Sequence, residues 1–296
     1  MKKFSAIIGF LTIGFLLWYL IIKPYDYLVT FKVKTSAGTI NQTIKLWNTS
    51  LENSSPIQQD NLANLTQQIK IKDSTYNYEW SISSVNDSIS KVNVYVTDLN
   101  NSLANKISIP FSKTDFEKRT EQTVTDFIDK LKEHLKKIKV TVVGKDTTRS
   151  TYCAYISMKG LQIEKARGMM QNYSLLTSIL SAENITMNGT PFVEITNWNT
   201  QNDSIAYNFC FPVIKSDSLP VDSRIQYKQY NGAKALKATY NGNYITSDRA
   251  WYALVDYAEN NDIKIDKKPL EVFYSNPNFG GDVLKWKAEI YMPIKE

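Results

Sequence analysis

"AKALKATYNG", residues Ala233–Gly242, decides the fold, because the earlier segment "TYCAYISMKG", residues Thr151–Gly160, has the same pattern. Each segment predicts a strand that ends at a glycine, and each is followed by a stretch in which apolar residues have helical spacing. The two glycines lie roughly eighty residues apart, which is the kind of fixed separation expected of a duplicated structural unit. The sequence therefore predicts an internal repeat.

Both copies continue in the same way after their helical stretch. The first copy has "TPFVEITNWN" from Thr190 and "SIAYNFCFPVI" from Ser204, and the second has "KPLEVFYSNPNF" from Lys268 and "LKWKAEIYMPIK" from Leu284. Their alternation of apolar and polar residues predicts two strands in each copy, and thus two βαββ units. Since each helix must bury its apolar side, we expect both helices on one face of a shared antiparallel sheet, with the other face open.

The open face is expected to carry one carboxylate, Glu289 of the last strand. Residue parity places Glu289 there together with Tyr291, and in the first copy the equivalent of Glu289 is Asn208, so we expect a charge on one side only. Parity also assigns further residues of both copies to this face, namely Tyr155, Cys153, Lys237 and Cys210. Three aromatic residues at strand ends or turns are expected at its rim: Trp198, Tyr244 and Tyr274.

The second copy resembles the GyrI-like small-molecule-binding domain, the effector-binding domain of AraC-type and MerR-type regulators. Three segments carry this resemblance: a Gly-x-Tyr turn before an aromatic-rich helix (Gly242, Tyr244), a Glu-x-aromatic strand ending in Asn-Pro (Glu271–Pro277), and a final Glu-Ile-Tyr-x-Pro-Ile (Glu289–Ile294). The resemblance covers residues 139–296. Two positions depart from it, because Asn241 and Asn276 stand where many members have histidine and aspartate.

The resemblance implies a ligand groove on the open sheet face, lined by aromatic side chains around an acidic residue. Glu289 occupies the acidic position, and the ligand-binding residues expected are Glu289, Tyr291, Tyr155, Lys237, Tyr244, Tyr274 and Trp198. A carboxylate in an aromatic groove favours a cationic or hydrogen-bond-donating planar ligand, since each ring face adds about 0.5–2 kcal/mol to the binding of a cation. The alternative is that the aromatic residues only pack and that Glu289 pairs across the sheet.

The part of the chain before the repeat resembles, more loosely, the SRPBCC or START-like superfamily. "DYLVTFKVKTS" from Asp26 predicts a strand, a short helix ends near Trp47, three more strands follow, and a long helix with an apolar stripe ends near Ile138. This element order is that of a helix-grip domain, in which a sheet curls around the last helix.

Residues Phe4–Ile22 form an uncharged run of 19 residues, which is about the length that a helix needs to cross a bilayer. No small-residue cleavage site follows, so we expect an uncleaved anchor. Lys2 and Lys3 precede the run, which favours a cytoplasmic N-terminus and places the rest outside the cytoplasm, in the periplasm. The expected fold class is therefore α+β, with a membrane helix (1–25), a START-like helix-grip domain (26–138) and a duplicated βαββ domain of SHS2 type that is GyrI-like (139–296).

Composition argues against several other functions. The net charge of +6 comes from dispersed lysines and arginines without a basic stripe, so no nucleic-acid partner is expected. The single histidine, His134, lies in a charged helical stretch, so histidine triads and His/Cys zinc sites lack their parts, and we expect no metal, no cofactor and no assigned catalytic residue. Cys153 and Cys210 fit either a disulfide or two buried thiols.

Three functions remain open. The leading hypothesis is a membrane-anchored protein that binds a small organic ligand with Glu289 as charge partner. The first alternative is a hydrolase of reactive small molecules, because some GyrI-like proteins resemble such hydrolases. This activity would require the groove to raise the pKa of Glu289 so that it can act as a base. The second alternative is an interaction module of the cell envelope whose open sheet face is covered by another protein.

Overall fold

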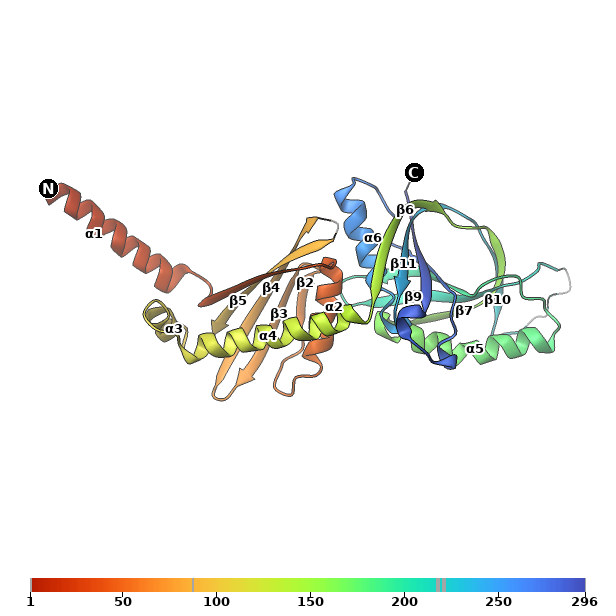
Figure 1. Ribbon diagram of the computed structural model, residues 1–296, viewed down its shortest axis with the longest axis horizontal. Coiled ribbons are helices and arrows are strands. Elements are labelled where there is room, and N and C mark those ends of the chain that lie inside the picture. Colours follow the sequence, from red (N-terminus) through yellow and green to blue (C-terminus); the bar gives the residue numbers. More distant parts are fainter. Residues whose placement is uncertain (1, 87, 217–218, 220–221, 296) are drawn as a thin grey trace. The chain divides into compact units, whose positions relative to one another are not determined.

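The structure is a computed structural model that describes residues 2–86, 88–216, 219 and 222–295 (Figure 1). Two residues lie outside the described residues at the chain termini: Met1, the first residue of the predicted anchor, and Glu296, the last residue of the predicted C-terminal domain. The chain divides into two compact units, which are Met1–Val85 with Ile89–Lys132, and Asn86–Ser88 with Glu133–Glu296. The described residues form two antiparallel sheets and their helices, so the predicted α+β class is confirmed.

The N-terminal apolar run is divided between two helical segments. Lys2–Leu17 is the α-helix α1, and Trp18–Ile22 continues as a π-helix of five residues. In the described part of the chain, no helix is both long enough and apolar enough to cross a membrane. The single spanning helix predicted over residues 4–22 is therefore not found, because the helical hydrogen-bond pattern changes at Trp18.

The first unit contains a five-stranded sheet in the order β1-β5-β4-β3-β2. Its elements are β1 (Tyr27–Val33), α2 (Ala37–Asn48), β2 (Gln58–Asn61), β3 (Asn64–Ile71), β4 (Ser74–Asn86), β5 (Ile89–Asp98), α3 (Ser102–Ser108) and α4 (Asp115–Lys136). The predicted order of strand, short helix, strands and long helix is confirmed. Two elements were not predicted: α3, and β2, whose four residues are all polar.

Aromatic side chains fill the space between α4 and this sheet, and Figure 1 shows α4 crossing the strands. The ring of Phe127 from α4 lies 4.9 Å from Trp80 of β4 and 5.5 Å from Trp47 of α2, measured between ring centroids. All three side chains are buried. Such tilted and edge-on pairs are a favourable arrangement of buried rings, so this part of the unit is a packed core.

The second unit contains an eight-stranded sheet in the order β10-β7-β9-β8-β12-β13-β11-β6. Its elements are β6 (Lys139–Thr147), β7 (Thr151–Leu161), α5 (Lys165–Ala182), β8 (Phe192–Asn199), β9 (Ser204–Pro212), β10 (Gln226–Tyr230), β11 (Lys234–Asn241), α6 (Arg249–Asn260), β12 (Leu270–Phe273) and β13 (Lys287–Pro293). The segments β7-α5-β8-β9 and β11-α6-β12-β13 confirm the two predicted βαββ copies. The outer strands β6 and β10 were not predicted.

A buried ion pair joins the two copies. Lys165 at the start of α5 pairs with Glu271 of β12, and its ammonium also donates to the hydroxyl of Ser247 at 2.8 Å. The other oxygen of Glu271 accepts a hydrogen bond of 2.6 Å from the indole N–H of Trp251 in α6. The side chains of Lys165 and Glu271 are both 0% exposed, so the start of α5 is fixed by charged groups that have no contact with water.

Gly168 allows α5 to approach the sheet closely. A Cβ atom at this position would overlap the hydroxyl oxygen of Tyr207 in β9 and would lie 3.3 Å from the sulfur of Met158 in β7. Any side chain at residue 168 would therefore push the helix away from the two strands or displace Tyr207.

Candidate functional site

The strand register brings the predicted groups of the second copy together on the sheet face that α5 and α6 leave open. Lys237 of β11 lies opposite Tyr291 of β13, and Leu270 of β12 lies opposite Tyr291 on the other side. Glu289 precedes Tyr291 by two residues and therefore points to the same face, next to Val272. Leu270 and Val272 give this polar group an apolar surrounding.

Four side chains contact the carboxylate of Glu289, which is itself 9% exposed. Its Oε2 accepts hydrogen bonds from the hydroxyls of Tyr274, at 2.8 Å, and Tyr291, at 2.9 Å. The ammonium of Lys237 lies 3.4 Å from the same oxygen. Oε1 accepts a hydrogen bond of 2.8 Å from Lys287. Glu289 is therefore an ion-paired and hydrogen-bonded carboxylate.

These contacts determine the protonation state of Glu289. Burial has the largest effect and by itself raises the pKa, but the hydrogen bonds from Lys287 and the two tyrosines and the charge of Lys237 together lower the pKa to about 2. Glu289 is ionised at neutral pH. A general base works best with a pKa near the operating pH, so the condition that the hydrolase hypothesis placed on Glu289 is not met.

The first copy also carries a carboxylate on the open face, so the expectation of a charge in the second copy alone is wrong. Asn208 donates a hydrogen bond of 2.8 Å to Glu194 of β8, and Ser157 donates one of the same length to Asn208. Glu194 forms an ion pair with Lys228 of β10, whose ammonium lies 4.9 Å from the ring centroid of Tyr155. The carboxylate belongs to β8, the strand next to the one that carries Asn208. The lysine that pairs with it belongs to β10, which was not predicted.

A polar cavity of about 640 Å³ opens at Glu289. Serine, threonine and tyrosine hydroxyls line much of it, and its charged lining residues are Asp146, Arg149, Lys237 and Glu289. Lys237 bridges the two acids, since its ammonium also lies 3.1 Å from Asp146. The formal charges of these four side chains cancel, so the cavity does not present a net negative charge.

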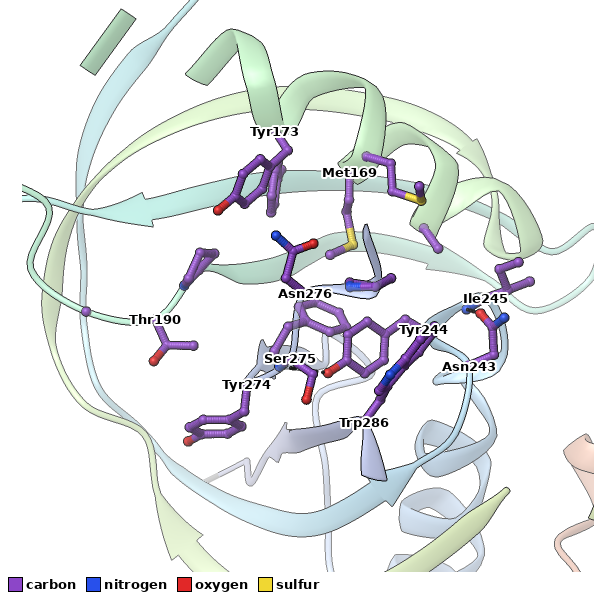
Figure 2. Close-up of a pocket in the computed structure, with 17 residues that line it drawn as sticks. Met169, Tyr173, Thr190, Asn243, Tyr244, Ile245, Tyr274, Ser275, Asn276 and Trp286 are labelled. Atoms are coloured by element: carbon purple, nitrogen blue, oxygen red, sulfur yellow. Dashed lines mark hydrogen bonds between the residues drawn. The ribbon is translucent and has the colours of Figure 1, made fainter. Parts of the chain in front are cut away.

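An apolar cavity of about 570 Å³ lies beside it, under α5 (Figure 2). Six aromatic residues line it: Tyr173, Phe209, Tyr244, Phe273, Tyr274 and Trp286. Figure 2 shows Met169 and Tyr173 of α5 on one side and Tyr244, Ser275 and Trp286 on the other. None of the 17 lining residues drawn carries a charged side chain. The walls therefore suit the body of an aromatic or aliphatic molecule.

The two cavities share part of their walls. Gly189, Thr190 and Tyr274 line both of them. The hydroxyl of Tyr274 reaches Glu289 in the polar cavity, whereas its neighbours Phe273 and Ser275 line the apolar one. Tyr274 thus connects an aromatic compartment with a carboxylate.

Five of the seven predicted ligand-binding residues line a cavity. Glu289, Tyr291 and Lys237 line the polar one, Tyr244 lines the apolar one, and Tyr274 lines both.

Two predicted residues line neither of these cavities. Tyr155 lies on the open face but within the cluster of the first copy. Trp198 is buried on the helix side, where its ring lies 5.2 Å from that of Trp251. Trp198 faces the helices because the register of β8 shifts between Ile195 and Asn197, which reverses the face to which the following residues point.

Several charged residues at these sites were not predicted from the sequence. Lys287 lies two positions before Glu289 on the same face, and this spacing could have identified it. Asp146 lies in the unpredicted strand β6, and Glu194 was not considered because Asn208 had been taken as the equivalent position.

Cys153 and Cys210 are both buried free thiols, so the structure contains no disulfide between them. Across the described ranges, no group of three or more histidine, cysteine or carboxylate side chains is placed to hold a metal ion.

Comparison with known proteins agrees with this architecture. The family model of the GyrI-like small molecule binding domain matches residues 149–295. Among solved structures, the chain is similar to the EcmrR C-terminal domain, with 14% identity over 54% of this chain and 98% of that chain and a TM-score of 0.44. It is also similar to SAV2435 bound to tetraphenylphosphonium (11% identity, 53% and 94% coverage, TM-score 0.35) and to a hydrolase from Listeria innocua (14%, 55% and 98%, 0.34).

No curated protein matches the chain. The predicted resemblance of the C-terminal half is nevertheless confirmed by the model of the GyrI-like small molecule binding domain, which matches residues 149–295.

Proposed function

We propose that this protein binds a small organic molecule in its GyrI-like domain, and that the ligand is an aromatic molecule with a cationic or hydrogen-bond-donating group. One observation carries the proposal: six aromatic residues line a cavity of about 570 Å³, and one of them, Tyr274, is hydrogen-bonded to Glu289. Ligand pockets commonly enclose about 300–1,000 Å³ and combine apolar walls with a few polar groups.

The aromatic body of the ligand would lie in the apolar cavity, against Tyr244, Phe273 and Trp286. Each well-oriented ring pair contributes about 0.5–1.5 kcal/mol beyond the area that it buries. The polar group would reach past Tyr274 to Glu289, whose pKa of about 2 keeps it ionised at neutral pH. The two cavities, of about 570 and 640 Å³, lie within the usual range of small-molecule pockets, which favours a small ligand over a protein partner.

Binding can be tested by titrating the protein with tetraphenylphosphonium, the molecule bound in the SAV2435 structure, while following tryptophan fluorescence, since Trp286 lines the apolar cavity. Triphenylphosphine oxide serves as a neutral probe of similar shape. We expect saturable binding of both probes, with the cation bound more tightly than the neutral molecule.

Two variants separate the roles of the cavity walls and of the charge. Glu289→Gln should reduce the preference for the cation, whereas Tyr274→Ala should weaken the binding of both probes. The matched control is Glu259→Gln, which removes an exposed carboxylate from α6 of the same unit. If neither probe binds saturably to the wild-type protein, the proposed function is wrong.

For the first unit, we propose a START-like helix-grip domain with a structural role, and we retain residues 26–138 and 139–296 as the boundaries of the two domains. Trp47, Trp80 and Phe127 occupy the space between sheet and helix, which is where a helix-grip domain would hold a ligand. A variant with a cavity there, Phe127→Ala, should leave the affinity for tetraphenylphosphonium unchanged.

We further propose that residues 1–25 attach the protein to a membrane and that its other parts lie outside the cytoplasm, in the periplasm. The apolar side chains of α1 support attachment, since Phe10 is 79% exposed and Phe4 is 70% exposed. The test compares the full chain with a chain that begins at Tyr25: only the full chain should sediment with membranes after carbonate washing. Protection from protease added to spheroplasts, whose outer membrane has been removed, would contradict the proposed location.

A further inference from the structure

We propose that the side chain of Lys287 occupies, in the ligand-free protein, the place that the cationic group of a ligand takes, so that Lys287 sets the selectivity of the site between cationic and neutral molecules. The inference rests on the proposed function and identifies a specificity-determining residue within it.

The ammonium of Lys287 has the two contacts that a ligand cation would make. It donates a hydrogen bond of 2.8 Å to Oε1 of Glu289, and it lies 4.9 Å from the ring centroid of Tyr274. A cation within about 6 Å of an aromatic centroid is attracted by the ring face. Glu289 and Tyr274 both line the polar cavity, and Tyr274 also lines the apolar one. Lys287 therefore binds the groups that are available to a cation entering from either cavity.

The backbone of Lys287 is held by hydrogen bonds, whereas its side chain is partly exposed. Its carbonyl oxygen accepts hydrogen bonds from the hydroxyl of Tyr244, at 2.8 Å, and from the backbone N–H of Tyr274, at 3.0 Å. The Lys287 side chain is 44% exposed, so it can leave Glu289 for water by rotation about its own bonds. A ligand can displace this ammonium without moving β13.

The second lysine at Glu289 is held more firmly. The Lys237 side chain is 17% exposed, and its ammonium lies between Asp146, at 3.1 Å, and Oε2 of Glu289, at 3.4 Å. It also lies 5.2 Å from the ring centroid of Tyr291. Displacing Lys237 would break contacts with two carboxylates, whereas displacing Lys287 breaks contact with one. A ligand cation would thus exchange with Lys287 at Oε1, while Lys237 and the two tyrosines stay on Oε2.

This exchange has a consequence for selectivity. A cationic ligand must compete with the ammonium of Lys287, whereas a neutral molecule in the apolar cavity does not touch Glu289 and meets no such competition. The native lysine therefore lowers the affinity for cations selectively. An exposed ion pair is worth about 0.2–1 kcal/mol and an exposed cation–ring contact about 0.5–1 kcal/mol, so removing the competitor should raise cation affinity by about 3- to 30-fold.

The test measures the dissociation constants of tetraphenylphosphonium and triphenylphosphine oxide for the full chain and three variants. Lys287→Met removes the ammonium but keeps the length of the side chain, and it should tighten only the binding of the cation. Lys287→Arg restores a competing cation and should resemble the wild type. Lys267→Met is the matched control, because Lys267 is an exposed lysine of the same unit and its removal changes the net charge by the same amount.

The outcomes distinguish this inference from the function on which it rests. If both probes bind to the wild type but Lys287→Met leaves the cation affinity unchanged or weaker, Lys287 does not occupy the cation position and the inference is wrong. An equal gain for both probes, or an equal gain in Lys267→Met, would also overturn it, because the effect would then be general. If neither probe binds to the wild type, the proposed function itself is refuted instead.

Discussion

Replacing Lys165 with methionine should destabilise the second unit by about 3–5 kcal/mol, the usual cost of leaving one member of a buried ion pair without its partner. Lys165 and Glu271 are each 0% exposed, and without the ammonium the carboxylate would keep only the hydrogen bond from the indole of Trp251. The charge cannot be solvated without opening the contact between α5 and β12.

A second substitution should reverse most of this loss. In the double variant Lys165→Met/Glu271→Gln neither position carries a charge, and the amide oxygen of the glutamine can still accept the hydrogen bond from Trp251. We expect the double variant to be more stable than Lys165→Met alone, because burying a neutral amide with a partner costs less than burying an unpaired carboxylate.

Native-state hydrogen exchange followed by mass spectrometry can measure the effect in the full chain, since it reports opening free energies segment by segment. Peptides from α6 and β12 report on the second unit, and peptides from β4 serve as an internal reference in the first. If protection in α6 and β12 falls as far in the double variant as in Lys165→Met, the loss does not come from an unpaired charge and the reasoning is refuted.

Three further predictions use other features of the structure. The pKa of Glu289 lies at about 2 in the folded state, below its ordinary value of 4.5, so the carboxylate contributes stability that is present above about pH 4.5 and is lost as the pH falls through about 2. Thermal unfolding should therefore show a difference between wild type and Glu289→Gln that shrinks from pH 5 to pH 2, and a constant difference would contradict this. Gly168→Ala should weaken the protection of α5 amides by crowding Tyr207, and adding Tyr207→Phe should restore part of it if the hydroxyl is the obstacle. Phe127→Ala should cost about 3–5 kcal/mol in the first unit, lowering protection in β4 peptides but leaving β12 peptides unchanged.

The sequence was sufficient to predict the repeat, because its signals are local. A strand that ends at Gly160 or Gly242, followed by a helical stripe and two alternating strands, appears twice at nearly constant spacing. The outer strands were missed for a physical reason. "QYKQY" of β10 contains no aliphatic residue, and it is a strand because β7 offers it a free edge, which cannot be seen in its own five residues.

The site was predicted where residue parity holds and missed where it does not. Glu289, Tyr291 and Lys237 lie where β13 and β11 pair with each other without a register shift, and they meet as expected. Trp198 lies beyond an irregularity in β8, which local sequence does not reveal, and it therefore faces the core. The pairing of Glu194 with Lys228 depends on two strands that are distant in the sequence, so a single sequence could not predict it.

The wall shared by the two cavities has a thermodynamic consequence. Because Tyr274 borders both compartments and is bonded to Glu289, a molecule that shifts this ring from the apolar side also changes the free energy of the carboxylate and its lysines on the polar side. Linkage is reciprocal, so a ligand at Glu289 that moves this ring would change the affinity of the apolar compartment by the same factor. For a ligand of that kind, an affinity measured in one compartment has meaning only when the occupancy of the other is stated.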